Sequence, residues 1–312
     1  MTVTSTRRLR PRSRIRESVF ERSAPYVYVA PFFLLFAVFG LFPMAFTFVI
    51  SLFDWNPIGT KTFIGFENFT TLFSDPRFWN AAGNTLSIWI MSTVPQLIIA
   101  LGLAHLLHFA RLRFANFFRM SLLVPYITSV AATAIVFAQL FDTHYGLINW
   151  VLTLIGGSPV NWLAGQLSSQ FVIAVMVIWR WSGYTTLLYL AGLQSIPKEM
   201  YEAASVDGAS GWRQFTSITI PSLRPIIIFT IITSTIGGLQ IFTEPLLVNS
   251  TGGLTCGAGR QCQTLTLYLY EQAFGDYKFG YGAAIGVALF IMVVVIAAIN
   301  FALSTRMKGS RS

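Results

Sequence analysis

Charged residues are scarce in this chain. Aspartate, glutamate, lysine and arginine together make up 11% of its 312 residues, whereas a soluble domain carries about 25%. The sequence has 3 histidines and 2 cysteines, so few side chains are available to hold a metal ion. It also contains no Gly-Lys dipeptide, and therefore no phosphate-binding loop of the common nucleotide-binding type. These shortages argue against a soluble domain, a metal centre and a nucleotide site in this chain.

Long apolar runs take the place of the missing charges. Hydrophobic residues make up 54% of the chain, and a helix needs about 20 apolar residues to cross a bilayer core of about 30 Å. Strands of a membrane barrel would be about 10 residues long and would alternate polar with apolar positions, unlike these runs. The first run is too long for a signal peptide and is expected to stay in the protein. We predict an all-α integral membrane protein whose six transmembrane helices cover residues 27–53, 85–108, 118–141, 170–193, 223–248 and 282–305.

The basic residues lie mainly on one side of these expected helices. The net charge is +9, but the first, third and fifth connections hold only Lys61, Arg77, Arg260 and Lys278. Because cytoplasmic connections are enriched in Lys and Arg, both termini are expected in the cytoplasm. Residues 1–25 are interpreted as a flexible basic cytoplasmic segment at the lipid surface, not as a nucleic-acid-binding arm. The membrane domain would then cover residues 26–312.

The external connections are expected at residues 54–84, 142–169 and 249–281. The last contains Cys256 and Cys262, which an oxidising compartment would allow to form a disulfide; two free thiols are the alternative. His105 and His108 are three residues apart near the end of the second expected helix. No carboxylate or cysteine accompanies them, so we interpret them as helix-end residues and expect no metal site.

Polar residues interrupt the fourth and fifth apolar runs, where they are costly and often mark a pathway. Aromatic faces and amide or carboxylate groups of this kind can hold the C–H surfaces and hydroxyl groups of a sugar. An ion pair between Arg180 and Glu244 that touches no substrate is an equally acceptable reading. Internal prolines such as Pro95 and Pro125 can kink the helices around a cavity, or can belong to ordinary packing. The candidate pathway residues are Arg180, Trp181, Tyr184, Gly237, Gln240, Thr243 and Glu244.

Residues 194–222 form the longest expected cytoplasmic connection and have a pattern of their own. Pro197 and the acidic residues after it favour the start of a helix, and Gly208 supplies a break. Apolar residues then recur at helical spacing from Trp212 until Pro221, which is expected to end the element below the next membrane helix. The simplest reading of this pattern alone is a helical surface segment lying on lipid headgroups.

The same segment resembles the EAA loop of bacterial ABC importer permeases. Glu202-Ala203-Ala204, three residues, a glycine, nine residues, then Ile218-Thr219-Ile220-Pro221 match this long motif, with Ile220 in place of the usual leucine. The resemblance implies a type I ABC importer permease fold, in which this loop docks in a groove of a cytoplasmic ATPase. It assigns ATPase coupling to Glu202, Ala203, Ala204, Asp207, Gly208, Ile218 and Pro221.

The resemblance extends over almost the whole chain. Residues 63–85 (FIGFENFTTLFSDPRFWNAAGNT) and 193–197 (LQSIP) look like segments of sugar permeases related to the maltose-transporter subunits, in which the position of Tyr184 is an aromatic residue lining the sugar site. The implied partners are a second homologous permease, an ATPase dimer that binds ATP and Mg, an extracytoplasmic sugar-binding protein, the sugar, and the lipid of a bacterial cytoplasmic membrane. No cofactor is expected on this chain and no enzymatic activity.

The substrate is the least defined of these expectations. Residues 84–104 and 145–163 look most like permeases for oligosaccharides, and a cellobiose-type β-glucoside is our first hypothesis. Another solute such as glycerol phosphate is the alternative within the family. A secondary transporter would need coupling-ion residues in its membrane helices, and a membrane-embedded enzyme would need a motif such as H-E-x-x-H, which is absent from the sequence.

Overall fold

The computed structural model describes residues 14–109 and 115–306 and divides the chain into two units, 1–49 and 50–312. In the first unit, helix α1 (Arg14–Phe36) continues through a π-helical turn, η1 (Ala37–Leu41), into α2 (Phe42–Ile50). The apolar stretch Ala24–Ile50 is long enough to span a membrane. Some of the basic residues expected on the cytoplasmic side lie outside the described residues. These are the ones before Arg14, at positions 111–113 and after Arg306.

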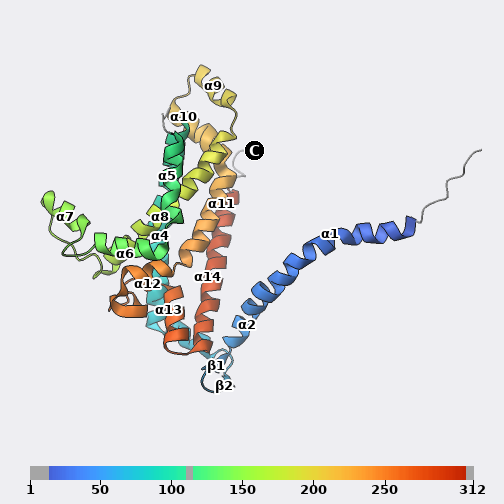
Figure 1. Ribbon diagram of the computed structural model, residues 1–312, viewed down its shortest axis with the longest axis vertical. Coiled ribbons are helices and arrows are strands. Elements are labelled where there is room, and N and C mark those ends of the chain that lie inside the picture. The colour runs from blue at the N-terminus through green and yellow to red at the C-terminus, as the bar shows by residue number, and fades with distance from the viewer. Residues whose placement is uncertain (1–13, 110–114, 307–312) are drawn as a thin grey trace, which may run out of the picture. The chain divides into compact units, whose positions relative to one another are not determined.

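The second unit is built mainly of long helices, and Figure 1 shows four of them side by side. These are α4 (Pro76–Phe109), α8 (Gln166–Gln194), α11 (Ile220–Leu239) and α14 (Phe279–Arg306). An antiparallel hairpin of β1 (Phe53–Trp55) and β2 (Lys61–Phe63), followed by α3 (Glu67–Ser74), lies at one end, which we call the hairpin end. Helices α9 (Lys198–Val206) and α10 (Gly211–Gln214) lie at the other, the α9 end.

Polar side chains join the long helices within their apolar surroundings. Gln96 of α4 donates to Thr185 of α8 at 2.8 Å, and Tyr189 of α8 shares a hydrogen bond of 2.7 Å with Thr230 of α11. All four side chains are buried. Helices also approach closely where a side chain is missing: a Cβ on Gly183 of α8 would lie 1.8 Å from the carbonyl oxygen of Leu122. Hydrogen bonds and small residues of this kind hold helices together in lipid.

The third predicted span is broken rather than straight. It consists of α5 (Ala115–Ile127) and α6 (Val130–Leu140), which meet at 93°. Pro125 has no N–H to donate within the helix, and Ser129 has the extended conformation with ψ 129°. Five described helices are long and apolar enough to span a membrane, and the bent pair makes the sixth. The all-α fold with six transmembrane helices is confirmed, but residues 118–141 do not form one helix.

The fifth predicted span, 223–248, is also wrong at both ends. Its helix begins earlier, because α10 continues through the π-helical turn η2 (Phe215–Thr219) into α11. Pro221 was expected to end an element, but it stands in the first turn of α11. The helix ends at Leu239, before the short helix α12 (Thr243–Val248). The carbonyl of Ile241, freed by this break, accepts hydrogen bonds from the hydroxyl groups of Thr264 and Thr266, so this carbonyl stays paired within the membrane helices.

Short helices fill several of the connections between the long ones. They are α7 (Leu147–Leu154), the 3₁₀ segment η3 (Ser250–Thr255), α13 (Leu265–Tyr270) and the π-helical turn η4 (Glu271–Gly275). Buried apolar residues of α6, α8 and these connections form one core cluster, which includes the two cysteines. A second cluster joins α4, α13 and α14, and a third joins α4, α8, α9 and α11 near the α9 end.

Candidate functional site

A cavity of about 400 Å3 lies among the membrane helices of the second unit. We call it the inner cavity. Its walls come from α4, α5, α8 and α11 and from the break before α12. Six of the seven pathway residues predicted from the sequence line it, and they are Trp181, Tyr184, Gly237, Gln240, Thr243 and Glu244.

One wall of the inner cavity is aromatic. Tyr184 stacks on Tyr126 of α5, with ring centroids 4.9 Å apart and an interplanar angle of 15°. Trp181 meets Tyr126 edge to face at 5.3 Å. Because α5 is brought against α8 by the close approach at Gly183, the three rings form one rigid surface. Flat aromatic surfaces of this kind suit the C–H faces of a sugar.

The facing wall is polar and carries no positive charge. Gln240 directly follows α11 and Thr243 is the first residue of α12, while Gln96 and Thr185 contribute from α4 and α8. Glu244 is the one formally charged residue among those that line the inner cavity in the described part of the chain. This lining offers hydrogen-bond donors and acceptors to a neutral polar ligand, and none of the described lining residues offers an anion a cationic partner.

Arg180 does not line the inner cavity. Its guanidinium Nη1 donates to Oε1 of Glu244 at 3.0 Å, and their side chains are only 9% and 11% exposed. The pair therefore joins the middle of α8 to the first turn of α12. The structure favours the ion-pair reading of Arg180, while Glu244 both holds the pair and faces the cavity.

Sequence reasoning missed several residues of the inner cavity. Tyr126 comes from the third span, where no other polar cluster pointed to a pathway, and the bend after it places its ring against Tyr184. Phe242 belongs to the break in the fifth span. Gln96 could have been found, because a glutamine inside an apolar run satisfies the same criterion that identified Gln240.

At the α9 end, the expected coupling residues divide into two groups. Glu202, Ala203, Asp207 and Gly208 are exposed on α9 and the turn after it. Gly208 has φ +78°, and the amide of Ala209 donates back to the carbonyl of Ala204 at 2.9 Å, which forms a glycine C-cap. Ala204 is half-buried. Ile218 and Pro221 are half-buried in the helical run towards the membrane, and Ile218 packs against the third core cluster.

This segment is firmly attached to the membrane helices. Tyr201 of α9 is buried, bonds Thr219 at 3.0 Å and packs its ring on Phe109 of α4 at 5.2 Å. His105 packs against Phe109 and Phe215. Its surroundings are aromatic, and in the described residues no three His, Cys, Asp or Glu side chains are placed to share a metal ion. Movement of α9 would therefore pull directly on α4 and on the helical run towards α11.

Two ionic clusters brace the hairpin end. Burial raises the pKa of Asp75, but hydrogen bonds from Arg77, Tyr268 and Tyr281 outweigh it and lower the pKa to about 2. Burial likewise acts against the charge of Glu271, and its bonds to Arg260 and Gln263 lower its pKa overall. Burial is also the main cause that raises the pKa of Tyr268, followed by its bond to Asp75. Both carboxylates therefore stay ionised. Asp75 joins the start of α4 to α13 and α14, and Glu271 holds the loop that precedes α13.

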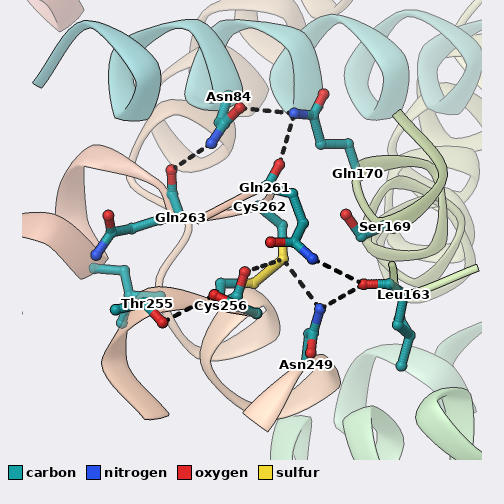
Figure 2. The surroundings of a disulfide bond; sticks show 12 residues. Asn84, Leu163, Ser169, Gln170, Asn249, Thr255, Cys256, Gln261, Cys262 and Gln263 are labelled. Atoms are coloured by element: carbon teal, nitrogen blue, oxygen red, sulfur yellow. Dashed lines mark hydrogen bonds between the residues drawn. A yellow bond between two sulfur atoms is a disulfide. The ribbon is translucent and has the colours of Figure 1, made fainter. Parts of the chain in front are cut away.

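The two cysteines lie in a disulfide bond at this end (Figure 2). Their Cα atoms are 5.3 Å apart, and the bond closes the loop between η3 and α13. Neither sulfur atom is exposed, because both residues are 0% exposed. Asn84 of α4 donates to the carbonyl oxygens of Arg260 and Gln263 at 3.0 and 3.1 Å, so α4 holds the loop in place.

Comparison with known proteins places this architecture. Residues 76–309 match the family described as "Binding-protein-dependent transport system inner membrane component". The chain belongs to this family. It is therefore a transport component of the inner membrane, and it is not an enzyme.

Individual permeases agree with the family assignment over most of their length. The chain is 36% identical to the arabinooligosaccharides transport system permease protein of Bacillus subtilis, over 93% of this chain and 91% of that one. It is 37% identical to the lactose transport system permease protein of Rhizobium radiobacter, over 88% and 92% of the two chains. A permease chain in the crystal structure of a bacterial alginate ABC transporter superposes with a TM-score of 0.80, at 22% identity over 94% of this permease and 98% of that chain. The type I importer permease fold is confirmed.

Proposed function

We propose that this permease forms, with a second homologous permease, the membrane pathway of an ATP-driven importer for a di- or oligosaccharide such as cellobiose. A dimer of separate ATPase subunits, which bind ATP and Mg, would drive it from the cytoplasm. An external sugar-binding protein would deliver the substrate. The observation that carries the proposal is the inner cavity, which combines stacked aromatic rings with polar side chains among the membrane helices.

The lining of the inner cavity favours a sugar over an anionic solute. Tyr184 and Trp181 offer flat surfaces for C–H groups, and Gln240 and Glu244 offer hydrogen bonds to hydroxyl groups. A phosphate ester such as glycerol phosphate would meet Glu244 without a cation among the lining residues of the described chain. The relatives named for arabinooligosaccharides and for lactose support the same class of substrate.

The coupling segment supplies the mechanical part of the proposal. Exposed apolar residues of α9 and α10, among them Val206 at 88% and Trp212 at 74%, suit a protein groove better than water. Glu202 adds a charge for a basic partner residue on the ATPase. Closure of the ATPase pair would move α9, and Tyr201 would transmit the movement to α4 and to the start of α11 through Phe109 and Thr219.

Uptake into proteoliposomes tests the substrate pathway. The complete transporter, with its ATPase subunits and binding protein, is expected to take up labelled saccharide in the presence of ATP. Tyr184→Ala and Gln240→Ala should each lower uptake at least tenfold, because each removes contacts to the sugar in the inner cavity. Co-purification of the subunits should be unchanged.

Tyr145→Ala is the matched control, since Tyr145 is 94% exposed and does not line the inner cavity. Its uptake should equal that of the wild type. Normal uptake in both cavity variants would remove the site assignment.

A further inference from the structure

A larger cavity, of about 720 Å3, lies outside the inner cavity at the external end of the same helices. We propose that this outer cavity is a second binding site, which takes a neutral, hydroxyl-rich ligand such as a segment of a saccharide chain. The proposal rests on the proposed transport of sugars and extends it. Asn80 and Thr93 of α4 line the outer and the inner cavity respectively, and thirteen residues of helix separate the two sites by about 20 Å.

Fixed oxygen atoms dominate the polar lining of the outer cavity. Asn80 uses its Nδ2 to donate to the carbonyl of Arg260 at 3.0 Å, and Gln166 uses its Nε2 to donate to Asn84 at 2.9 Å. Each amide is therefore anchored by its nitrogen, and its oxygen is left for a ligand. Asp142 is anchored likewise, because its Oδ1 accepts the amides of His144 and Tyr145 at 2.8 Å. Oriented acceptors of this kind select a ligand that carries hydroxyl donors.

The remaining lining supports a saccharide rather than an ion. Asp142 is the single formally charged residue among those that line the outer cavity in the described chain, so an anion would find no cationic partner there. Phe141, Leu163 and Ala258 add apolar surface on which C–H groups can pack. Asn161 is exposed, and its side chain makes no hydrogen bond with another described residue. The volume lies within the range of about 300–1,000 Å3 that is usual for small-molecule sites.

The disulfide loop forms a preorganised wall of the outer cavity (Figure 2). Gln261, between the two cysteines, and Asn249 both donate to the carbonyl of Leu163, at 3.2 and 2.9 Å, which ties the loop to the opposite wall. Cys256 and Arg260 have φ values of 52° and 54°, which side-chain-bearing residues rarely adopt. The crosslink and these hydrogen bonds hold the wall in this shape, and a site shaped in advance loses less entropy on binding.

Saturation-transfer NMR on the complete transporter in nanodiscs, without its binding protein, tests the outer site with cellotetraose as the probe. A transporter carrying Tyr184→Ala and Gln240→Ala lacks the inner contacts and should keep at least half of the wild-type signal. Adding Asn161→Trp, which fills the outer cavity, should reduce that signal at least fivefold. Ser158→Trp is the matched control, because Ser158 is exposed on the same connection and does not line the cavity, and it should change nothing.

Three results would overturn the outer site. The first is loss of the signal in the Tyr184→Ala, Gln240→Ala transporter, and the second is a signal that survives Asn161→Trp. The third is an equal signal from choline, which would indicate a cation attracted by Asp142. ATP-driven uptake by the wild type separates the two proposals: uptake without an outer-site signal refutes the outer site alone, whereas an absence of any saccharide uptake refutes the proposed function.

Discussion

Replacing Arg180 or Glu244 by methionine removes one half of the ion pair between α8 and α12. At the observed 3.0 Å, two unit charges attract each other by about 5 kcal/mol at an effective dielectric constant of about 20. Most of that attraction is offset by the cost of taking both charges out of water. Removing a single partner leaves the other charge buried and costs about 3–5 kcal/mol, whereas replacing both partners by apolar residues is nearly neutral.

The two single variants should not be equal. Glu244 lines the inner cavity, so water can reach its carboxylate when Arg180 is replaced. Arg180 is 8% exposed, and its buried Nε finds no hydrogen-bond partner among the described residues. Its guanidinium also stays charged under all ordinary conditions. We therefore expect Glu244→Met to cost about 5 kcal/mol and Arg180→Met about 3 kcal/mol.

Thermal unfolding of the detergent-solubilised full-length chain, followed by size-exclusion chromatography, measures these differences. At about 2 °C per kcal/mol, the single variants should unfold about 6–10 °C below the wild type, and the double variant within about 2 °C of it. Arg213→Met is the control, since Arg213 is exposed and forms no ion pair with another described residue, and surface substitutions of this kind usually change stability by less than about 0.5 kcal/mol. If the two single losses simply add up in the double variant, the residues are not coupled and the reasoning is refuted.

Three further predictions concern the external end and the helix packing. Asp75→Asn should lower thermal stability by a constant amount between pH 8 and pH 5, and the difference from the wild type should shrink below about pH 4. The reason is that a carboxylate with a native pKa of about 2 contributes its full stability above its unfolded pKa and loses it as the pH falls towards 2. A difference that grows in acid would contradict this. Gly183→Leu should abolish the monodisperse chromatographic peak, because its Cβ would lie 1.8 Å from the Leu122 carbonyl, whereas Gly102→Leu, with open space around it, should keep the peak. Replacing Cys256 and Cys262 together by serine should cost about 2 kcal/mol for so short a loop, and dithiothreitol should lower the unfolding temperature of the wild type but not of this variant.

The sequence was sufficient to predict the membrane fold, but not the helix ends. Apolar run length identifies a span because it counts the residues that lipid can surround. Run length does not reveal the bend after Pro125 or the end of α11 at Leu239, because apolar residues resume within a few positions of each break. The second break depends on Thr264 and Thr266, which satisfy the carbonyl of Ile241 from another segment.

The parts of the candidate site that could be predicted are the polar residues that stand out individually in an apolar run. Polar side chains in apolar runs pointed to Gln240 and Glu244, and both line the inner cavity. The pairing of Glu244 with Arg180 stayed undecided, because 64 residues separate the two in the chain and only the packing of α12 against α8 brings them together. The prediction that Pro221 ends a helix was wrong, because the π-helical turn η2 before it leads directly into α11 and Pro221 stands in the first turn of that helix.

For the coupling loop, the match to a known motif was more informative than the spacing of its apolar and polar residues. Spacing alone favoured a helix on the lipid surface, and the match to the EAA motif replaced that reading. The structure then adds what no motif contains, namely the contact of Tyr201 with Phe109 and Thr219 that joins α9 to the membrane helices.

ATP-driven saccharide uptake by reconstituted transporters carrying Glu202→Lys or Gly208→Val tests the central claim most directly. Glu202 is exposed on α9, and Gly208 has φ +78°, which valine cannot adopt without strain. We expect both variants to insert and to bind saccharide as the wild type does, while ATP-driven uptake falls at least tenfold. Wild-type uptake in both variants would mean that movement of the ATPases does not reach the sugar pathway through this segment.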